Sequence, residues 1–120
     1  MRRLILSLEG RVDVAGIPAR SGDAFGQQAR RRYGVLLDVA LRDLLDDPKA
    51  VGSQMGPDLG VGVHIYHLRH SRQRARGAGV IVSDPRHLIF YEYDEAEVRV
   101  MRILHEAMDL ARHIPSSGQP

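Results

Sequence analysis

Hydrophobic and polar positions follow a helical period most clearly between residues 24 and 46. Apolar side chains recur there at spacings of three and four residues, which predicts an amphipathic helix with one buried face. Ser21 or Asp23 is expected to cap its start, and Pro48 is expected to end it. The apolar ridge predicts core packing, and a groove for a partner helix is the other interpretation. Its members are Phe25, Ala29, Tyr33, Leu36, Leu37, Ala40, Leu44 and Leu45.

The segment before this helix has a weaker pattern. Arg2–Ser7 is a short apolar run that predicts a strand. Residues 8–20 show some helical spacing, but Gly10 and Gly16 each weaken a helix by roughly 1 kcal/mol relative to alanine. Pro18 cannot lie inside a helix without removing a backbone hydrogen bond. We therefore expect only a short, marginal helix over residues 8–20.

The last third of the chain carries the signature of a β-hairpin. Leu88–Tyr93 and Val98–Leu104 are rich in β-branched and aromatic residues, and the acidic turn Asp94–Glu97 separates them. Val63–Leu68 and Gly79–Ser83 are further strand candidates. Together these runs predict an antiparallel meander.

The remaining segments are expected to lie outside regular structure. Val51–Gly62 holds four glycines and one proline, so it predicts a loop. The order is then a strand, two helices and a run of strands, which predicts an α+β fold with the helices on one face of the sheet. We expect a single domain over residues 1–114 and a disordered tail over residues 115–120.

Composition restricts the class of protein. The chain has no cysteine, which excludes a disulfide scaffold and a cysteine-based zinc site. Residues 1–20 carry charges throughout and contain no long apolar run, so we expect no signal peptide, no membrane partner and a cytoplasmic location. The net charge is +2, and Lys49 is the one lysine among seventeen basic residues. Arginine forms planar, forked contacts with carboxylates and phosphates.

The densest basic segment is Arg69–Arg76, which contains four arginines and one histidine, with Arg86 following. One interpretation is a solvated hairpin loop whose charges protect a sheet edge. The others are a contact surface for an acidic protein or for nucleic acid. Direct nucleic-acid binding is the least favoured, because the segment has no interleaved aromatic residues for base stacking.

Histidines are the other residues with potential chemistry. His64, His67 and His70 lie in a strand-like run, where alternation places the middle one on the opposite face, so we expect no metal site. His105 with Asp109, and Arg112 with His113, could support acid–base work on RNA, although a structural role for His105 is favoured. No phosphate-binding glycine loop or hydrolase motif is present. We therefore assign no catalytic residue and expect no cofactor.

Several fragments of the chain, taken in order, are similar to one protein family. The fragments are LSLEGRVDVAGI (Leu6–Ile17), FGQQARRRYGVLLDVALRDLLDDP (Phe25–Pro48), YHLRHSRQRAR (Tyr66–Arg76), PRHLIFY (Pro85–Tyr91) and RILHEAMDLARHI (Arg102–Ile114). Together they resemble the ParE-type toxins of the RelE/ParE superfamily. Gly10, Gly16 and Pro18 depart from the good helix formers of that family.

The resemblance implies a RelE/ParE-like α+β fold, in which an N-terminal strand and a two-helix hairpin pack on a mostly antiparallel sheet. It implies the toxin of a bacterial type II toxin–antitoxin pair, of the kind that stabilises plasmids. The implied target is DNA gyrase, and a ParD-like antitoxin would neutralise the toxin. One alternative is a ribosome-dependent mRNA interferase of the RelE type, which would need His105, Arg86 or Arg112. The other is a non-toxic, antitoxin-binding relic.

Candidate contact residues follow from these interpretations. The antitoxin-binding candidates are Tyr33, Leu37 and Tyr91. The target-binding candidates are Arg69, His70, Arg72, Arg74, Arg76, Arg86, Met108, Asp109, Arg112 and His113.

Overall fold

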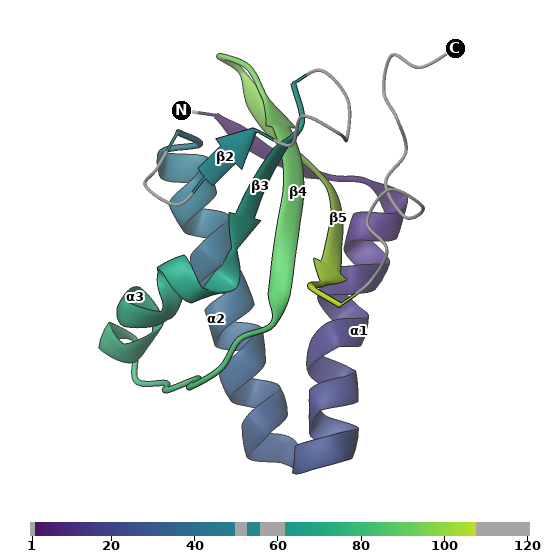
Figure 1. Cartoon of the computed structure of the whole chain (residues 1–120), viewed down its shortest axis with the longest axis vertical. Coiled ribbons are helices and arrows are strands. Elements are labelled where there is room, and N and C mark those ends of the chain that lie inside the picture. Colours follow the sequence, from purple (N-terminus) through teal and green to yellow (C-terminus); the bar gives the residue numbers. More distant parts are fainter. Residues whose placement is uncertain (1, 50–52, 56–61, 108–120) are drawn as a thin grey trace.

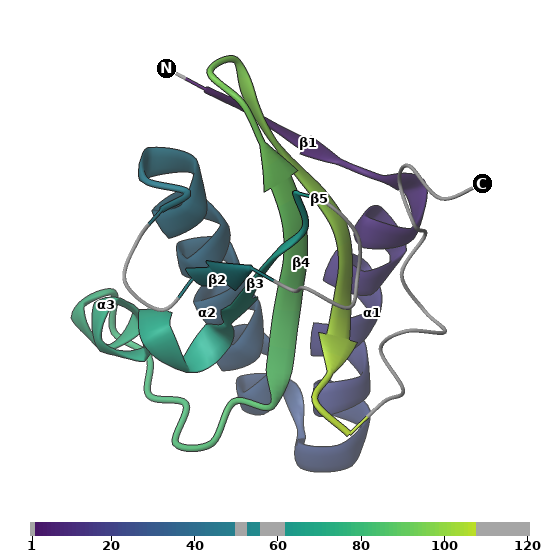
Figure 2. The ribbon, with the colours of Figure 1, turned by 45° about the horizontal axis from the view of Figure 1, so that its top comes forward.

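A computed structural model of the protein describes residues 2–49, 53–55 and 62–107. Within these residues, two long helices pack on a five-stranded sheet with strand order β1-β5-β4-β3-β2 (Figures 1 and 2). β1 runs parallel to β5, and every other neighbouring pair is antiparallel. The elements are β1 (Arg3–Leu6), α1 (Leu8–Phe25), α2 (Gln27–Asp46), β2 (Ser53–Met55), β3 (His64–His67), the 3-10 helix η1 (Leu68–Ser71), α3 (Arg72–Gly77), β4 (His87–Tyr93) and β5 (Glu97–His105).

This arrangement confirms the predicted α+β fold. The N-terminal strand is followed by a helical hairpin, and the hairpin lies across the sheet. The sheet is mostly antiparallel, as predicted. The strands predicted over residues 63–68, 88–93 and 98–104 are present with small changes at their ends.

Helix α1 is longer than the sequence indicated. It has 18 residues and continues through Pro18 to Phe25, so the prediction of a short, marginal helix over residues 8–20 was wrong. Tertiary packing outweighs the proline, because Ile17 is buried in the core and Pro18 faces Gly34 of the neighbouring helix. The Ser7 side chain caps the start of α1 by accepting a hydrogen bond from the Gly10 amide.

Gly10 has a specific reason to be glycine. A Cβ atom at this position would lie 3.1 Å from the carbonyl oxygen of Val100. The absent side chain lets the first turn of α1 approach the backbone of β5 closely. The sequence showed the helix-weakening effect of this glycine but not the close approach that requires it.

The junction between the two long helices also differs from the prediction. Helix α2 begins at Gln27, after Gly26, whose φ of +96° lies in the region that favours glycine. Ser21 and Asp23 lie inside α1, so neither caps α2. Phe25 ends α1 and is 80% exposed, so its predicted place in the apolar ridge of α2 was wrong.

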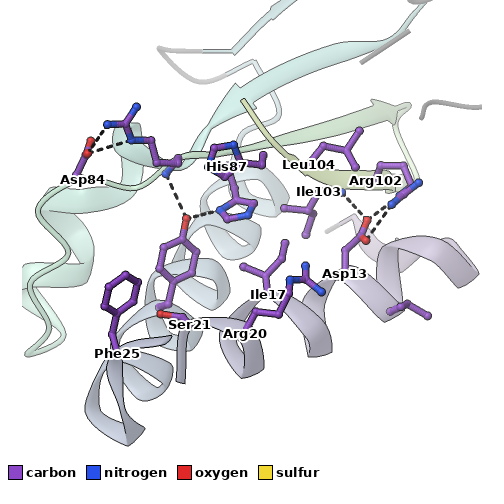
Figure 3. A pocket seen from close by; sticks show the side chains of 14 residues that line it. Asp13, Ile17, Arg20, Ser21, Phe25, Asp84, His87, Arg102, Ile103 and Leu104 are labelled. Atoms are coloured by element: carbon purple, nitrogen blue, oxygen red, sulfur yellow. Dashed lines mark hydrogen bonds and ion pairs between the residues drawn. The ribbon is translucent and has the colours of Figure 1, made fainter. Parts of the chain in front are cut away.

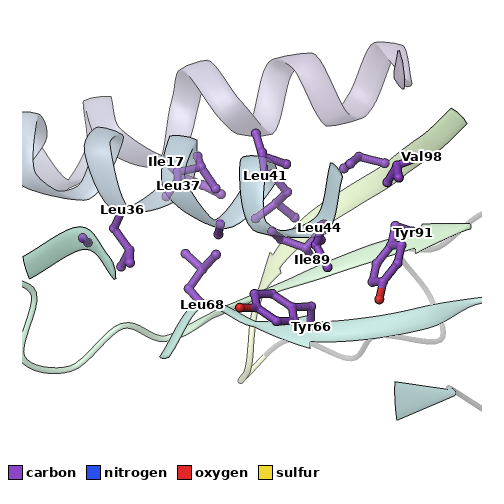
Figure 4. Close-up of a cluster of buried hydrophobic side chains, with 14 of the residues drawn as sticks. Ile17, Leu36, Leu37, Leu41, Leu44, Tyr66, Leu68, Ile89, Tyr91 and Val98 are labelled. Carbon is purple, nitrogen blue, oxygen red and sulfur yellow. The ribbon is translucent and has the colours of Figure 1, made fainter. Parts of the chain in front are cut away.

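Most of the rest of the predicted ridge lies in or against the core, while Ala29 is half-buried outside it. Leu36, Leu37 and Leu44 of α2 are almost fully buried, and Ile17 of α1 joins them (Figure 4). They pack on sheet residues that include Ile89, Tyr91 and Val98. Alternation along the strands sends other side chains to a second, smaller cluster, which consists of Val63, Phe90, Met101 and Leu104.

The predicted hairpin joins β4 and β5. Asp94 organises its turn, because the carboxylate accepts hydrogen bonds from the amides of Ala96 and Glu97 at 2.8 and 2.9 Å. Arg99 makes an ion pair with the same carboxylate at 2.8 Å. These contacts lower the pKa of Asp94, with the Arg99 hydrogen bond as the largest cause.

Three further predictions were wrong. Residues 79–83 form no strand, because the sheet has no place for one between β3 and β4, and Val80 instead packs into the core. The predicted loop over residues 51–62 contains the short strand β2. Residues 69–76 form most of η1 and most of α3 instead of a hairpin loop.

The tail predicted over residues 115–120 lies outside the described residues.

The core position of Leu37 generates a prediction. Leu37→Asp is expected to unfold the domain, or to reduce its free energy of unfolding by about 3–5 kcal/mol, because it buries an unpaired charge. Chemical denaturation followed by circular dichroism measures this loss. Arg42→Asp on the exposed face of the same helix is the control and should change stability by about 1 kcal/mol or less. A stable Leu37→Asp variant would show that this position is not part of the core.

Candidate functional site

The edge of β5 organises the region where polar side chains gather. β1 pairs with β5 only as far as Val100, so within the residues that the structure describes the following part of β5 has no strand on this side. Side chains from the start of α1 replace the missing strand. The Ser7 hydroxyl donates to the carbonyl oxygen of Met101, and the Asp13 carboxylate accepts from the amide of Ile103 at 2.9 Å.

Asp13 makes two further contacts. The Arg102 guanidinium donates to both carboxylate oxygens, at 2.8 and 3.1 Å, in a forked arrangement. Asp13 is only 7% exposed, so its charge needs this partner. The Asp13 hydrogen bond is also the main cause that raises the pKa of Arg102.

Beyond this contact, a cavity of about 680 Å³ lies between α1 and the ends of β4 and β5 (Figure 3). That volume is in the range of sites that bind small molecules. Buried apolar side chains form part of the lining, and charged, imidazole and phenol groups form the rest. The lining residues are Val12, Asp13, Ile17, Arg20, Ser21, Phe25, Tyr33, Asp84, Arg86, His87, Arg102, Ile103, Leu104 and His105.

Tyr33 and His87 form a hydrogen-bonded pair in this cavity. The Tyr33 oxygen lies 2.6 Å from His87 Nδ1, and the backbone amide of Arg86 donates to the same oxygen at 3.3 Å. Burial lowers the pKa of His87 to about 4, and the nearby His105 and Arg20 act in the same direction. Burial also raises the pKa of Tyr33. Both side chains are therefore neutral near pH 7.

A second polar network borders the cavity. Glu106 accepts from Arg86 at 2.8 Å and lies 2.9 Å from the Nε2 atom of the buried His67. These two hydrogen bonds, that of His67 first, lower the pKa of Glu106. Arg86 also pairs with Asp84 at 2.8 Å. The guanidinium of Arg86 is thus held between two carboxylates.

The predicted basic segment lies in a different part of the molecule, on η1 and α3. Its charged side chains are exposed, while Ser71 and Ala75 are buried and fix the segment to the core. The Tyr66 hydroxyl and the Asp43 carboxylate lie 2.8 and 2.6 Å from the Ser71 hydroxyl. Arg74 pairs with the same carboxylate at 3.0 Å. The exposed members are Arg69, His70, Arg72, Arg74 and Arg76.

The other target-binding and antitoxin-binding candidates do not lie together in the structure. Arg86 lies at the cavity and not with the α3 surface. Leu37 and Tyr91 are 2% and 0% exposed, and Tyr33 is half-buried. Antitoxin binding by these three residues stays a prediction. The remaining target-binding candidates, Met108, Asp109, Arg112 and His113, lie outside the described residues.

Sequence reasoning missed several members of the cavity. Arg20 lay at the end of the helix predicted for residues 8–20, and only the continuation of α1 gives it a fixed position. Tyr33 and His87 are 54 positions apart, and no local pattern joins them. Asp13 and Arg102 are separated by 89 positions. Asp13 lies four residues before the apolar Ile17, on the same face of a helix, and this spacing was the one available signal for it.

Comparison with known proteins identifies the family. Residues 4–110 match the family model for the ParE toxin of the type II toxin–antitoxin system parDE. The chain belongs to the ParE toxin family. No curated protein sequence matches the chain significantly. The family match covers all the described helices and, apart from the first residue of β1, all the described strands.

Membership of this family makes the chain the toxin component of a type II toxin–antitoxin system, with an antitoxin as its partner. No helix in the described part of the chain is long and apolar enough to cross a membrane. In the same residues, no group of three potential metal ligands is placed to hold an ion.

The contact between α1 and β5 generates a prediction. Asp13→Asn should reduce the free energy of unfolding by about 2–4 kcal/mol, because it leaves the half-buried Arg102 guanidinium without its carboxylate. Urea denaturation measures the loss. Asp38→Asn, which removes an exposed ion pair with Arg42, is the matched control and should cost less than about 1 kcal/mol. Equal losses in the two variants would contradict a structural role for Asp13.

The lowered pKa of His87 predicts a dependence of stability on pH. The unfolded chain binds a proton near pH 6.5, whereas the folded ring does so only near pH 4. The unfolded state therefore gains protons first as pH falls, and the free energy of unfolding decreases between pH 6.5 and 4. For this half-buried ring, we expect a loss of roughly 2 kcal/mol across that window.

The comparison of wild type with His87→Gln isolates this contribution, because carboxylates titrate in both proteins. Urea denaturation at several pH values between 4 and 7 should give a shallower dependence for the variant. NMR titration should show the wild-type ring neutral at pH 5. The same slope in both proteins would exclude His87 as its source.

Proposed function

We propose that this toxin acts on DNA gyrase, has no catalytic activity of its own and is neutralised by a ParD-like antitoxin. The observation that carries the proposal is the basic surface of η1 and α3, considered together with membership of the ParE family. This surface presents several arginines on a segment that is anchored by the buried Ser71 and Ala75. Such a rigid cationic surface suits a contact with an acidic region of a larger protein.

The ion pairs in the cavity support a mechanism without catalysis. Two of its guanidiniums are already committed, since Arg86 binds Asp84 and Glu106, and Arg102 binds Asp13. His87, with its pKa near 4, is a weak base at neutral pH. These groups are less available for acid–base work on RNA than unpaired groups would be.

A ribosome-dependent mRNA interferase is the second candidate, because Tyr33, His87 and His105 share one cavity with several arginines. Under that mechanism, His105, Arg86 or Arg112 would be essential for RNA cleavage. A non-toxic relic is the third candidate, and it would cause no growth arrest.

For the antitoxin, the proposal concerns the helical hairpin and the sheet as a surface. Leu37 and Tyr91 are buried and would act by fixing the elements that the antitoxin covers, while the partly exposed Tyr33 would contact it directly. A segment that folds on binding would bury a large area and lose its own conformational entropy.

Charge reversal on α3 tests the proposed target. Arg72→Glu combined with Arg76→Glu should abolish growth arrest and the DNA damage response in bacteria that express the chain alone. The charge of the contact is inverted, while the core under α3 is unchanged. Purified gyrase should lose supercoiling activity with wild type and retain it with the variant. Arg11→Glu, an exposed reversal on α1, is the control and should remain toxic.

Other outcomes would replace the proposal. Supercoiling that wild-type protein leaves unaffected would remove gyrase as the target. Rapid loss of messenger RNA without a DNA damage response, abolished by His105→Gln, would favour the interferase. Full toxicity of the folded double variant would make the α3 arginines an ordinary solvated surface.

A further inference from the structure

The cavity between α1 and the sheet presents hydrogen-bond donors more than acceptors. The Tyr33 oxygen accepts from the Arg86 amide and lies 2.6 Å from Nδ1 of His87. We assign the arrangement in which the Tyr33 hydroxyl donates its proton to Nδ1, because each polar group then has a partner. A neutral His87 ring that accepts at Nδ1 carries its proton on Nε2. The pair therefore leaves His87 with a donor N–H.

A backbone contact gives the His105 ring the same tautomer. The backbone amide of Ala107 donates to His105 Nδ1 at 3.0 Å. A backbone amide only donates, so Nδ1 carries no proton and Nε2 is the N–H donor. The rings of His87 and His105 lie 5.3 Å apart, edge to face, and both line the cavity.

The third donor is the guanidinium of Arg20. Its side chain lies beside Ile17 on the cavity side of α1 (Figure 3). Asp13 and Asp84 are the carboxylates in the lining, and each is paired with an arginine, Arg102 or Arg86. Within the described residues, Arg20 forms no ion pair, so it carries the unbalanced positive charge of the cavity.

Apart from Ser21, the rest of the lining is apolar. Ile17, Ile103 and Leu104 are almost fully buried and form part of the wall. Val12 and Phe25 add apolar surface, and they are 64% and 80% exposed. A ligand that matches the whole cavity would combine an anionic group with a flat apolar body.

We propose that this cavity binds a small phosphate monoester with an aromatic body, of the nucleoside monophosphate class. The phosphate oxygens accept from the Arg20 guanidinium and from Nε2–H of His87 and His105. The aromatic body lies against the apolar wall and Phe25. A phosphate supplies three acceptor oxygens for these three donor groups. This site is separate from the α3 surface, so it does not depend on the gyrase proposal.

Titration of the purified full chain with adenosine 5′-monophosphate tests the site. NMR should show saturable shifts of the His87 and His105 rings, with His64, which does not line the cavity, unaffected. Arg20→Gln should weaken binding about tenfold or more, because a charge-assisted hydrogen bond is lost. Inorganic phosphate and adenosine should each bind at least about tenfold more weakly than the nucleotide, because each provides half of the contact.

Matched variants and probes decide between the alternatives. Arg11→Gln has the same charge change on the same helix outside the cavity, and it should bind like wild type. Absence of shifts up to about 10 mM nucleotide would overturn the proposal. If Arg20→Gln and Arg11→Gln weakened nucleotide binding equally, the binding would be general charge attraction and the proposed site would be wrong. A single-stranded oligoribonucleotide that binds at least ten times more tightly than the mononucleotide would overturn the assignment of a small ligand.

Discussion

The end of β1 leaves the neighbouring part of β5 with backbone groups that none of the described strands pairs, and the fold depends on how these groups are satisfied. Ser7 and Asp13, at the start of α1, bind the carbonyl oxygen of Met101 and the amide of Ile103. Gly10 allows the close approach that these contacts need. An unpaired buried backbone group would cost about as much as a lost hydrogen bond. Helix α1 therefore takes the place of a strand at this edge.

The cavity follows from the same contact. Once Asp13 holds α1 against β5, the rest of the helix continues past Pro18, and its later residues face the ends of β4 and β5. Tyr33 of α2 closes one side by binding His87. The electrostatics of the region also follow, because burial and neighbouring positive charges favour a neutral His87 ring.

The molecule therefore presents two chemically different regions. The surface of η1 and α3 is an exposed cationic segment that Ser71 joins to Asp43 and Tyr66. Most of its charge is available to a partner. The cavity is concave and partly apolar, and among the residues that the structure places its ion pairs leave Arg20 as the unbalanced cation. A macromolecular partner suits the first region, and a small anion suits the second.

The sequence by itself determined the elements with strong local periodicity. The apolar ridge of α2 and the β4–β5 hairpin with its Asp94 turn were both predictable, since their signals come from neighbouring positions. Membership of the ParE family could also be inferred from the sequence, because many fragments in order resemble that family. Only the tertiary structure decided that α1 continues through Pro18, because the burial of Ile17 offsets a local penalty. It also brought Tyr33 to His87, since a contact between distant positions leaves no periodic trace in the chain.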